Sequence, residues 1–214
     1  MKLGLFGGTF NPVHFGHLRA AQELAEILKL DRVVFIPAAT PPHKENGGIV
    51  SFEHRLRMLQ LAVAGNDSFS ISDVENSRPG KSYSIDTVRH FQNAGDSRLE
   101  CFFVTGQDAF DAIATWHDWK NLLRMCRFVV MTRPGYENLG LDRILPPDVA
   151  GRYEYDAAGD VFKDSQGGSI FFRQTTFLDI SSSEIRKRIQ QGRCVRYLTP
   201  DSVIGYMEAN RLYQ

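Results

Sequence analysis

The chain has 214 residues, a length that suits one domain with a substantial hydrophobic core. Its 25 basic and 25 acidic residues balance, so no overall field points to nucleic acid or to an anionic membrane as a partner. Any positive charge that binds phosphate must therefore be local. The three cysteines form neither a metal-ligand spacing nor a disulfide framework, and no apolar run approaches membrane-spanning length. We expect a soluble cytoplasmic protein.

Short apolar runs alternate along the chain with helical patterns. In chain order we expect a strand at 3–6, a helix at 18–28, a strand at 32–36, a helix at 52–64, a strand at 69–74, a helix from 84, and strands at 99–104, 128–132 and 170–172. This alternation predicts a Rossmann-like, doubly wound α/β fold, with a mainly parallel sheet and helices on both faces. Ligands of such sheets bind at the C-terminal ends of the strands, near a topological switch point.

The strand–helix pattern weakens between residues 137 and 177, where prolines and glycines divide the chain into polar pieces. We expect an irregular insertion there, with a small surface hairpin formed by 153–155 and 160–163. Residues 181–214 return to helical patterning. The sequence thus predicts a single domain over 1–214 with a small C-terminal helical elaboration.

A glycine turn follows the first expected strand and leads into the first expected helix. Its residues are Gly7, Gly8, Thr9 and Phe10. A turn in this position aims free backbone N–H groups and the positive end of a helix dipole at an anion. By itself it also fits a plain tight turn that needs glycine for its backbone angles, because it lacks both the Walker ending and the GxGxxG spacing.

Two histidines lie just beyond this turn. His14 and His17 flank Gly16 and are three residues apart, so both rings can lie on one side of the helix entrance. A helix N-terminus disfavours a protonated imidazole, and an anionic ligand would offset that cost. The pair therefore favours phosphate binding over a purely structural role.

A second candidate anion site begins the helix that follows Ile180. Ser181 and Glu184 have the spacing of a capping box, which by itself explains a well-capped helix. Free N–H groups at Ser181 and Ser182, with the guanidinium of Arg186 one turn further on, could equally hold a phosphate tail. The pattern alone supports a structural cap and a phosphate site equally.

Polar residues also follow other expected strands. Lys44 lies in a proline-rich loop after the second strand, and Asp108 and Arg133 each follow a later one. Loop residues of this kind are usually solvated, but the C-terminal ends of parallel strands meet at one edge, so we expect these side chains to cluster. Trp116 and His117 fit core packing by default, although a tryptophan beside polar residues can stack on a planar ring.

These residues resemble the nucleotidyltransferase superfamily that carries an HxGH motif, here at 14–17. Within it, the chain is similar to the bacterial nicotinate-nucleotide adenylyltransferases over nearly its whole length. The similar segments occur in that family's order: 7–17, 41–44, 82–87, 106–108, 115–116, 133–135 and 180–186. Asn11 stands where the family often has aspartate, and Ser84 and Ser183 each replace a usual threonine.

The resemblance implies transfer of the adenylyl group of ATP to nicotinate mononucleotide, giving deamido-NAD and pyrophosphate. It implies that His14 and His17 are catalytic and that Mg²⁺ arrives with ATP, without a metal site of the protein's own. The residues implied for ATP binding are Gly7, Gly8, Thr9, Phe10, Lys44, Gly106, Asp108, Ile180, Ser181, Ser182 and Arg186. Those implied for nicotinate mononucleotide are Ser84, Trp116, His117 and Arg133.

Two other interpretations stay open. A transferase for another phosphate acceptor, such as nicotinamide mononucleotide, phosphopantetheine or a polyol phosphate, would share the opening motif. Acceptors of the last two kinds would not account for the 82–87 and 115–119 segments. A non-catalytic nucleotide-binding protein on the same fold is opposed by the intact histidine pair. The sequence leaves the oligomeric state open, a homo-oligomer included.

Overall fold

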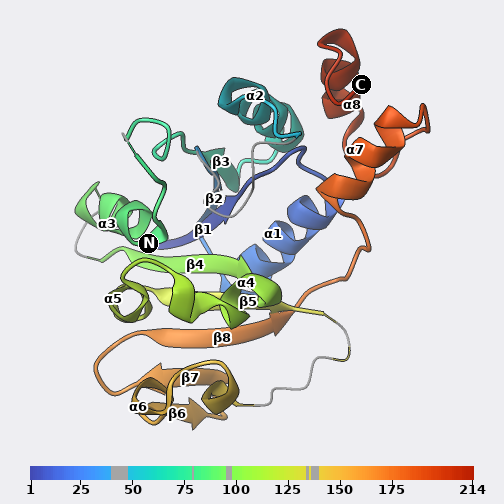
Figure 1. Ribbon diagram of the computed structural model, residues 1–214. Helices are drawn as coiled ribbons and strands as arrows, with labels where there is room; N and C mark the ends of the chain where they lie inside the picture. Colours follow the sequence, from blue (N-terminus) through green and yellow to red (C-terminus); the bar gives the residue numbers. More distant parts are fainter. Residues whose placement is uncertain (40–47, 79, 95–97, 134, 136–139) are drawn as a thin grey trace.

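The computed structural model describes residues 1–39, 48–78, 80–94, 98–133, 135 and 140–214 (Figure 1). Within them, one eight-stranded sheet has the order β3-β2-β1-β4-β5-β8-β7-β6. In chain order its strands are β1 (Lys2–Gly8), β2 (Arg32–Pro37), β3 (Phe69–Ile71), β4 (Glu100–Gly106), β5 (Arg127–Thr132), β6 (Tyr153–Asp156), β7 (Val161–Asp164) and β8 (Ser169–Gln174). Neighbours from β3 to β8 pair in parallel, whereas β7 and β6 pair antiparallel beyond β8.

Helices cover both faces of this sheet. They are α1 (Phe15–Leu28), α2 (Phe52–Val63), α3 (Ser84–Ala94), α4 (Gln107–Asp111), α5 (Trp119–Met125), α6 (Pro147–Ala150), α7 (Ser182–Gln190) and α8 (Asp201–Ala209), with short 3₁₀ turns η1 (Ile113–Thr115) and η2 (Leu141–Arg143). Successive side chains of a strand point to opposite faces. Leu5 of β1 accordingly lies in one apolar cluster with Val88 of α3. Its neighbour Phe6 lies in the other, with Leu24 of α1 and Met207 of α8. The predicted doubly wound α/β fold is confirmed.

The order of the strands defines where a ligand would bind. From β1 the chain adds β2 and β3 on one side, and then returns to add β4, β5 and β8 on the other. The C-terminal ends of β1 and β4 therefore form the topological switch point. The largest departures from the predicted boundaries are three residues: β3 ends at Ile71, and α1 begins at Phe15, directly after His14.

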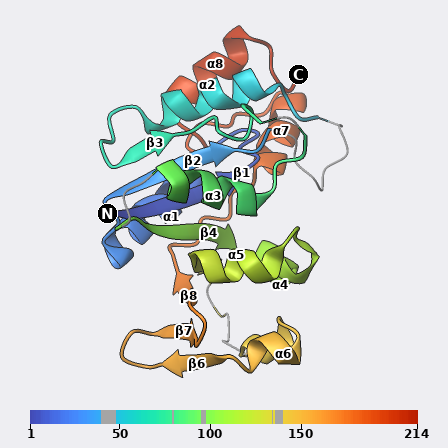
Figure 2. The ribbon, with the colours of Figure 1, turned by 90° about the vertical axis from the view of Figure 1, so that its left-hand side faces the viewer.

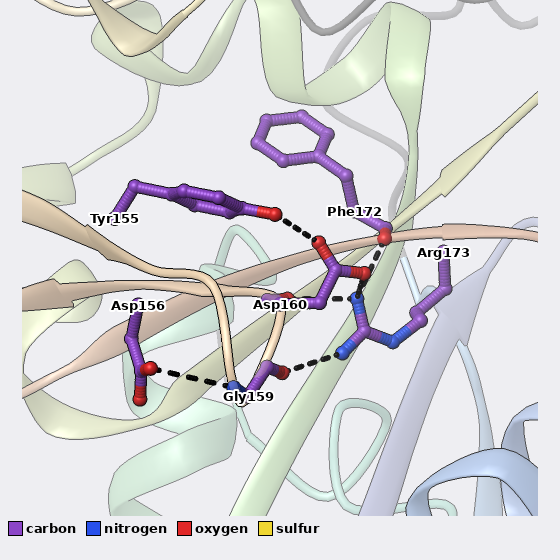
Figure 3. A network of polar contacts seen from close by, with 6 residues as sticks. All are labelled: Tyr155, Asp156, Gly159, Asp160, Phe172 and Arg173. Atoms are coloured by element: carbon purple, nitrogen blue, oxygen red, sulfur yellow. Dashed lines mark hydrogen bonds and ion pairs between the residues drawn. The ribbon is translucent and has the colours of Figure 1, made fainter.

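Of the stretch 137–177, expected to be irregular, the described residues 140–177 are more ordered than predicted. The small hairpin predicted within it exists as β6 and β7, and it extends the sheet through β8. Its turn is held by a polar network (Figure 3), in which Asp160 accepts from the Tyr155 hydroxyl at 2.8 Å and from the Arg173 guanidinium at 2.8 Å. Arg173, from β8, also donates to the Gly159 carbonyl at 3.3 Å. The hairpin turn is thus fastened to the strand beside it.

The chain beyond β8 forms the predicted C-terminal helices. Figures 1 and 2 show α7 and α8 with α2 at the end of the molecule opposite the β6–β7 hairpin. A hydrogen bond of 2.9 Å between His54 Nδ1 and the Tyr206 hydroxyl joins α2 to α8. Among the residues that the structure describes, no helix has the length and apolar character needed to cross a membrane.

Candidate active site

A tight turn joins the end of β1 to the start of α1. A Cβ on Gly8 would lie 2.8 Å from the ring of Phe10, so this position needs glycine to let the ring approach. The left-handed backbone, expected at a glycine, belongs to Phe10 instead, with φ of 48°. Phe10 is 2% exposed and its ring packs against that of Phe6. Its main chain is therefore the part of Phe10 that a ligand could meet.

The two histidines form a stacked pair at the entrance of α1. Their ring centroids are 3.6 Å apart, and the main-chain N–H of His14 donates to Nδ1 of His17 at 3.2 Å. Because Nδ1 accepts, a neutral His17 carries its proton on Nε2. Burial lowers the pKa of His14 to about 4, so this ring is neutral at pH 7. His14 would therefore meet an anion as a neutral group rather than as a cation.

The start of α7 lies against the turn that precedes α1. The Ser182 hydroxyl donates to the Pro12 carbonyl at 2.8 Å, and Arg186 Nη1 donates to the Asn11 carbonyl at 2.8 Å. The Ser181 hydroxyl caps α7 by accepting the main-chain N–H three residues further on, at 3.1 Å. The two candidate anion sites, far apart in the sequence, are thus next to each other in the fold.

A cavity of about 600 Å³ opens at the topological switch point. Its lining includes six of the predicted site residues: Gly7, Gly8, Thr9, Ser84, Trp116 and His117. Because Ser84 begins α3, the positive end of that helix dipole lies at the cavity wall. The rings of Tyr83 and His117 stack 4.2 Å apart, and Trp116 packs edge-on against Phe103. The cavity thus combines aromatic surface with a helix end that favours negative charge.

The lining also includes residues that were not predicted as site residues, Glu75, Lys81 and Tyr83 among them, although Tyr83 lies in the similar segment 82–87. Glu75 is 9% exposed and accepts from the Thr87 hydroxyl at 3.1 Å. Burial raises the pKa of Glu75 above its ordinary value, because desolvation disfavours the charged carboxylate. Glu75 could have been predicted from the sequence, because it directly follows the third expected strand, just as Asp108 follows a later one.

Asp108 and Arg133 lie at the ends of neighbouring strands, as predicted, but they pair with each other. Their side chains are 3.3 Å apart and 85% and 67% exposed. Arg133 also lies over the ring of Phe177, 5.5 Å from its centroid. Neither residue is part of the lining of the 600 Å³ cavity. The structure therefore does not group Arg133 with Ser84 and Trp116.

The remaining predicted residues lie elsewhere. Gly106 ends β4 and is the N-cap of α4. Ile180 lines a separate open groove of about 570 Å³ along α1, together with Leu18 and Leu178. Lys44 lies outside the described residues.

Comparison with known proteins shows which family the chain belongs to. The cytidylyltransferase-like family matches residues 5–188. A protein of Geobacter sp. (strain M21) named "Probable nicotinate-nucleotide adenylyltransferase" is 46% identical over 213 residues, covering 100% of this chain and 98% of the relative. The chain belongs to the nicotinate-nucleotide adenylyltransferase family. A second member, from Citrifermentans bemidjiense, is also 46% identical, with the same coverage of both chains.

Solved structures support the fold of this adenylyltransferase family member. The nicotinic acid mononucleotide adenylyltransferase of Plasmodium falciparum, complexed with NaAD, superposes with a TM-score of 0.73. The match covers 99% of this chain and 97% of that one at 16% identity, which supports a shared fold and no finer statement.

Proposed function

We propose that the protein transfers the adenylyl group of ATP to nicotinate mononucleotide, giving nicotinate adenine dinucleotide and pyrophosphate. One observation carries the proposal: the stacked His14–His17 pair follows the same strand end whose glycines line the 600 Å³ cavity. In this arrangement the histidines would donate to a reacting phosphate beside a cavity that would accept an aromatic anion. The full-length similarity to nicotinate-nucleotide adenylyltransferases supports the same reaction.

The phosphate side of the reaction needs positioning and charge stabilisation rather than a protein nucleophile. A phosphate oxygen of the mononucleotide attacks the α-phosphorus of ATP, and the bond to the pyrophosphate oxygen breaks. His17, with its proton on Nε2, would donate to the charge that develops on the α-phosphate. The backbone N–H groups from Gly7 to Phe10 and the α7 start with Arg186 would hold the remaining phosphates.

The acceptor would occupy the cavity between β1, α3 and the Trp116 segment. Ser84 and the N-terminus of α3 would bind the nicotinate carboxylate, and Trp116 with His117 would contact the ring. Arg133 and Asp108 form an exposed ion pair of the kind that contributes little to stability, so it can open to meet a ligand. Their roles, and that of Lys44 on the triphosphate, stay predictions.

Mg²⁺ would enter as part of the ATP substrate. Within the described part of the chain, no group of three or more His, Cys, Asp or Glu side chains is placed to hold a metal ion. Mg²⁺ commonly binds through substrate phosphates with few protein ligands. The triphosphate would therefore supply most of its ligands.

Replacing the histidine closest to the chemistry tests this proposal. We expect His17→Ala to lower kcat for pyrophosphate release from ATP and nicotinate mononucleotide by about 100-fold or more, because a donor to the transition state is lost. His90→Ala, an exposed histidine on α3, is the control and should match the wild type. Retained nucleotide binding with no pyrophosphate release by either His17→Ala or the wild type would refute the enzymatic role.

A further inference from the structure

A buried cation lies directly behind the wall of the cavity. Arg55 of α2 is 1% exposed. Its guanidinium donates to four main-chain carbonyl oxygens: Nε to Val50 at 3.2 Å, Nη1 to Thr9 at 3.0 Å and Ala38 at 2.7 Å, and Nη2 to Ala39 at 3.3 Å. Every arm of the guanidinium thus has a partner, and all four partners belong to the backbone.

Two of these carbonyls belong to the site itself. Thr9 and Ala38 both line the cavity, and each follows one of the two neighbouring strands β1 and β2. The Ala38 N–H also donates to the Gly8 carbonyl at 2.9 Å, which joins the same two strand ends. Nη1 of Arg55 adds a second link just beyond the paired strands, because it joins the Thr9 and Ala38 carbonyls.

In the part of the chain that the structure describes, the charge of Arg55 is not used in an ion pair. No carboxylate oxygen of the described residues lies within ion-pair distance of it, although Glu53 and Glu75 act on it from further away. A buried charge is costly unless it is extensively hydrogen-bonded, and an apolar residue would pack beside Phe52 and Met58 at lower cost. Because arginine stays protonated even where burial lowers its pKa, a positive charge persists beside the strand ends.

We propose that Arg55 is a positioning residue for adenylyl transfer. By fixing the Thr9 and Ala38 carbonyls, it sets the wall against which the acceptor mononucleotide lies, and so the distance between acceptor and ATP. This inference rests on the proposed function, since it takes the acceptor as the occupant of the cavity. A planar fork of donors is required for this task, and the single ammonium of lysine cannot bridge four carbonyls in the same geometry.

Arg55→Lys tests the proposal, because it keeps the charge and loses the fork. We expect kcat to fall about 10- to 100-fold and the KM for nicotinate mononucleotide to rise about tenfold, since small displacements of reacting groups are costly. The KM for ATP should rise less, by under about threefold, because Arg55 contacts one residue of the glycine turn, Thr9, and neither the histidine pair nor the α7 start. Arg57→Lys is the matched control on the same helix: Arg57 is exposed, donates to Gln60, and should give wild-type values.

Thermal unfolding of each variant separates positioning from a general loss of fold. The proposal is overturned by unchanged kinetics of Arg55→Lys, or by equal changes in both KM values that follow a lowered melting temperature. It is also overturned if both Arg55→Lys and Arg55→Gln fail to fold, since arginine would then be a requirement of the whole fold. Failure of the proposed function itself is distinguishable: the wild type would release no pyrophosphate with nicotinate mononucleotide.

Discussion

At the scale of single residues, Asn11 joins the turn before α1 to the segment 48–50 and to the C-terminal Tyr213. Its amide donates to the Gly48 carbonyl at 2.8 Å, and its Oδ1 accepts from the Val50 N–H at 3.2 Å and the Tyr213 hydroxyl at 2.7 Å. The residue is 2% exposed. An aspartate, usual in the family that the sequence resembles, could accept the last two hydrogen bonds but could not donate to Gly48.

We therefore expect Asn11→Asp to destabilise this protein. The substitution leaves the Gly48 carbonyl facing a carboxylate in a buried position, at a cost of about 1–3 kcal/mol in the free energy of unfolding. Denaturant unfolding at pH 7 measures it, with Asn93→Asp on the exposed side of α3 as the control. Equal stability of Asn11→Asp and wild type would show that the donor to Gly48 is dispensable.

The buried His14 predicts a pH dependence of stability. Its pKa is lowered to about 4 in the fold from an ordinary value of 6.5, so between these values the unfolded chain binds more protons. The free energy of unfolding is therefore unaffected by the protonation of this histidine above pH 6.5, and it decreases as the pH falls towards 4. Between pH 7.5 and pH 5 the decrease amounts to about 2 kcal/mol of unfolding free energy. Denaturant unfolding at both pH values should show this loss in the wild type and a smaller one in His14→Gln; equal losses would contradict the assignment.

Single residues also show why part of the site escaped sequence reasoning. Arg55 lies at helical spacing from Phe52, Met58 and Leu59, all buried, so its place on the apolar face of α2 was visible in the sequence. The hydrogen-bond partners of Arg55 could not be predicted, because every residue has a main-chain carbonyl and the sequence does not show which carbonyls a side chain will reach. The histidine pair was predictable, since two functional groups three residues apart on one helix must be neighbours.

At the scale of elements, the strands and helices were largely predictable because their apolar periodicity is local. The hairpin β6–β7 was expected as a small surface hairpin, and in the structure it continues the main sheet through β8. That outcome depends on β8 pairing with β5 and on Arg173 reaching Asp160, and neither long-range contact has a signature within 153–164.

The hairpin network should matter for local stability and not for catalysis. Asp160 has a positive φ of 46° and anchors both Tyr155 and Arg173, so Asp160→Ala should lose about 1–2 kcal/mol of unfolding free energy. Amide hydrogen exchange in β6 and β7 should become faster, whereas Glu154→Ala, at an exposed position, should leave it unchanged. Pyrophosphate release should stay within about twofold of the wild type; a larger loss would place the hairpin in the active site.

At the scale of the whole molecule, the site is assembled from both ends of the chain. The carbonyls of Asn11, Pro12 and Val13 accept from Arg186, Ser182 and Thr199, respectively. The sequence marked the glycine turn and the α7 start as two separate candidate anion sites. Their proximity follows from the return of the chain after β8, which no local pattern encodes.

The selectivity of the acceptor cavity tests the central claim most directly. Wild-type kcat/KM would be measured by pyrophosphate release from ATP with nicotinate mononucleotide, nicotinamide mononucleotide and phosphopantetheine. The helix end at Ser84 and the aromatic surface of Trp116 favour a flat, negatively charged acceptor. We expect nicotinate mononucleotide to give the highest value, by about tenfold or more over its amide. Equal values for the acid and the amide, or a preference for phosphopantetheine, would contradict the account.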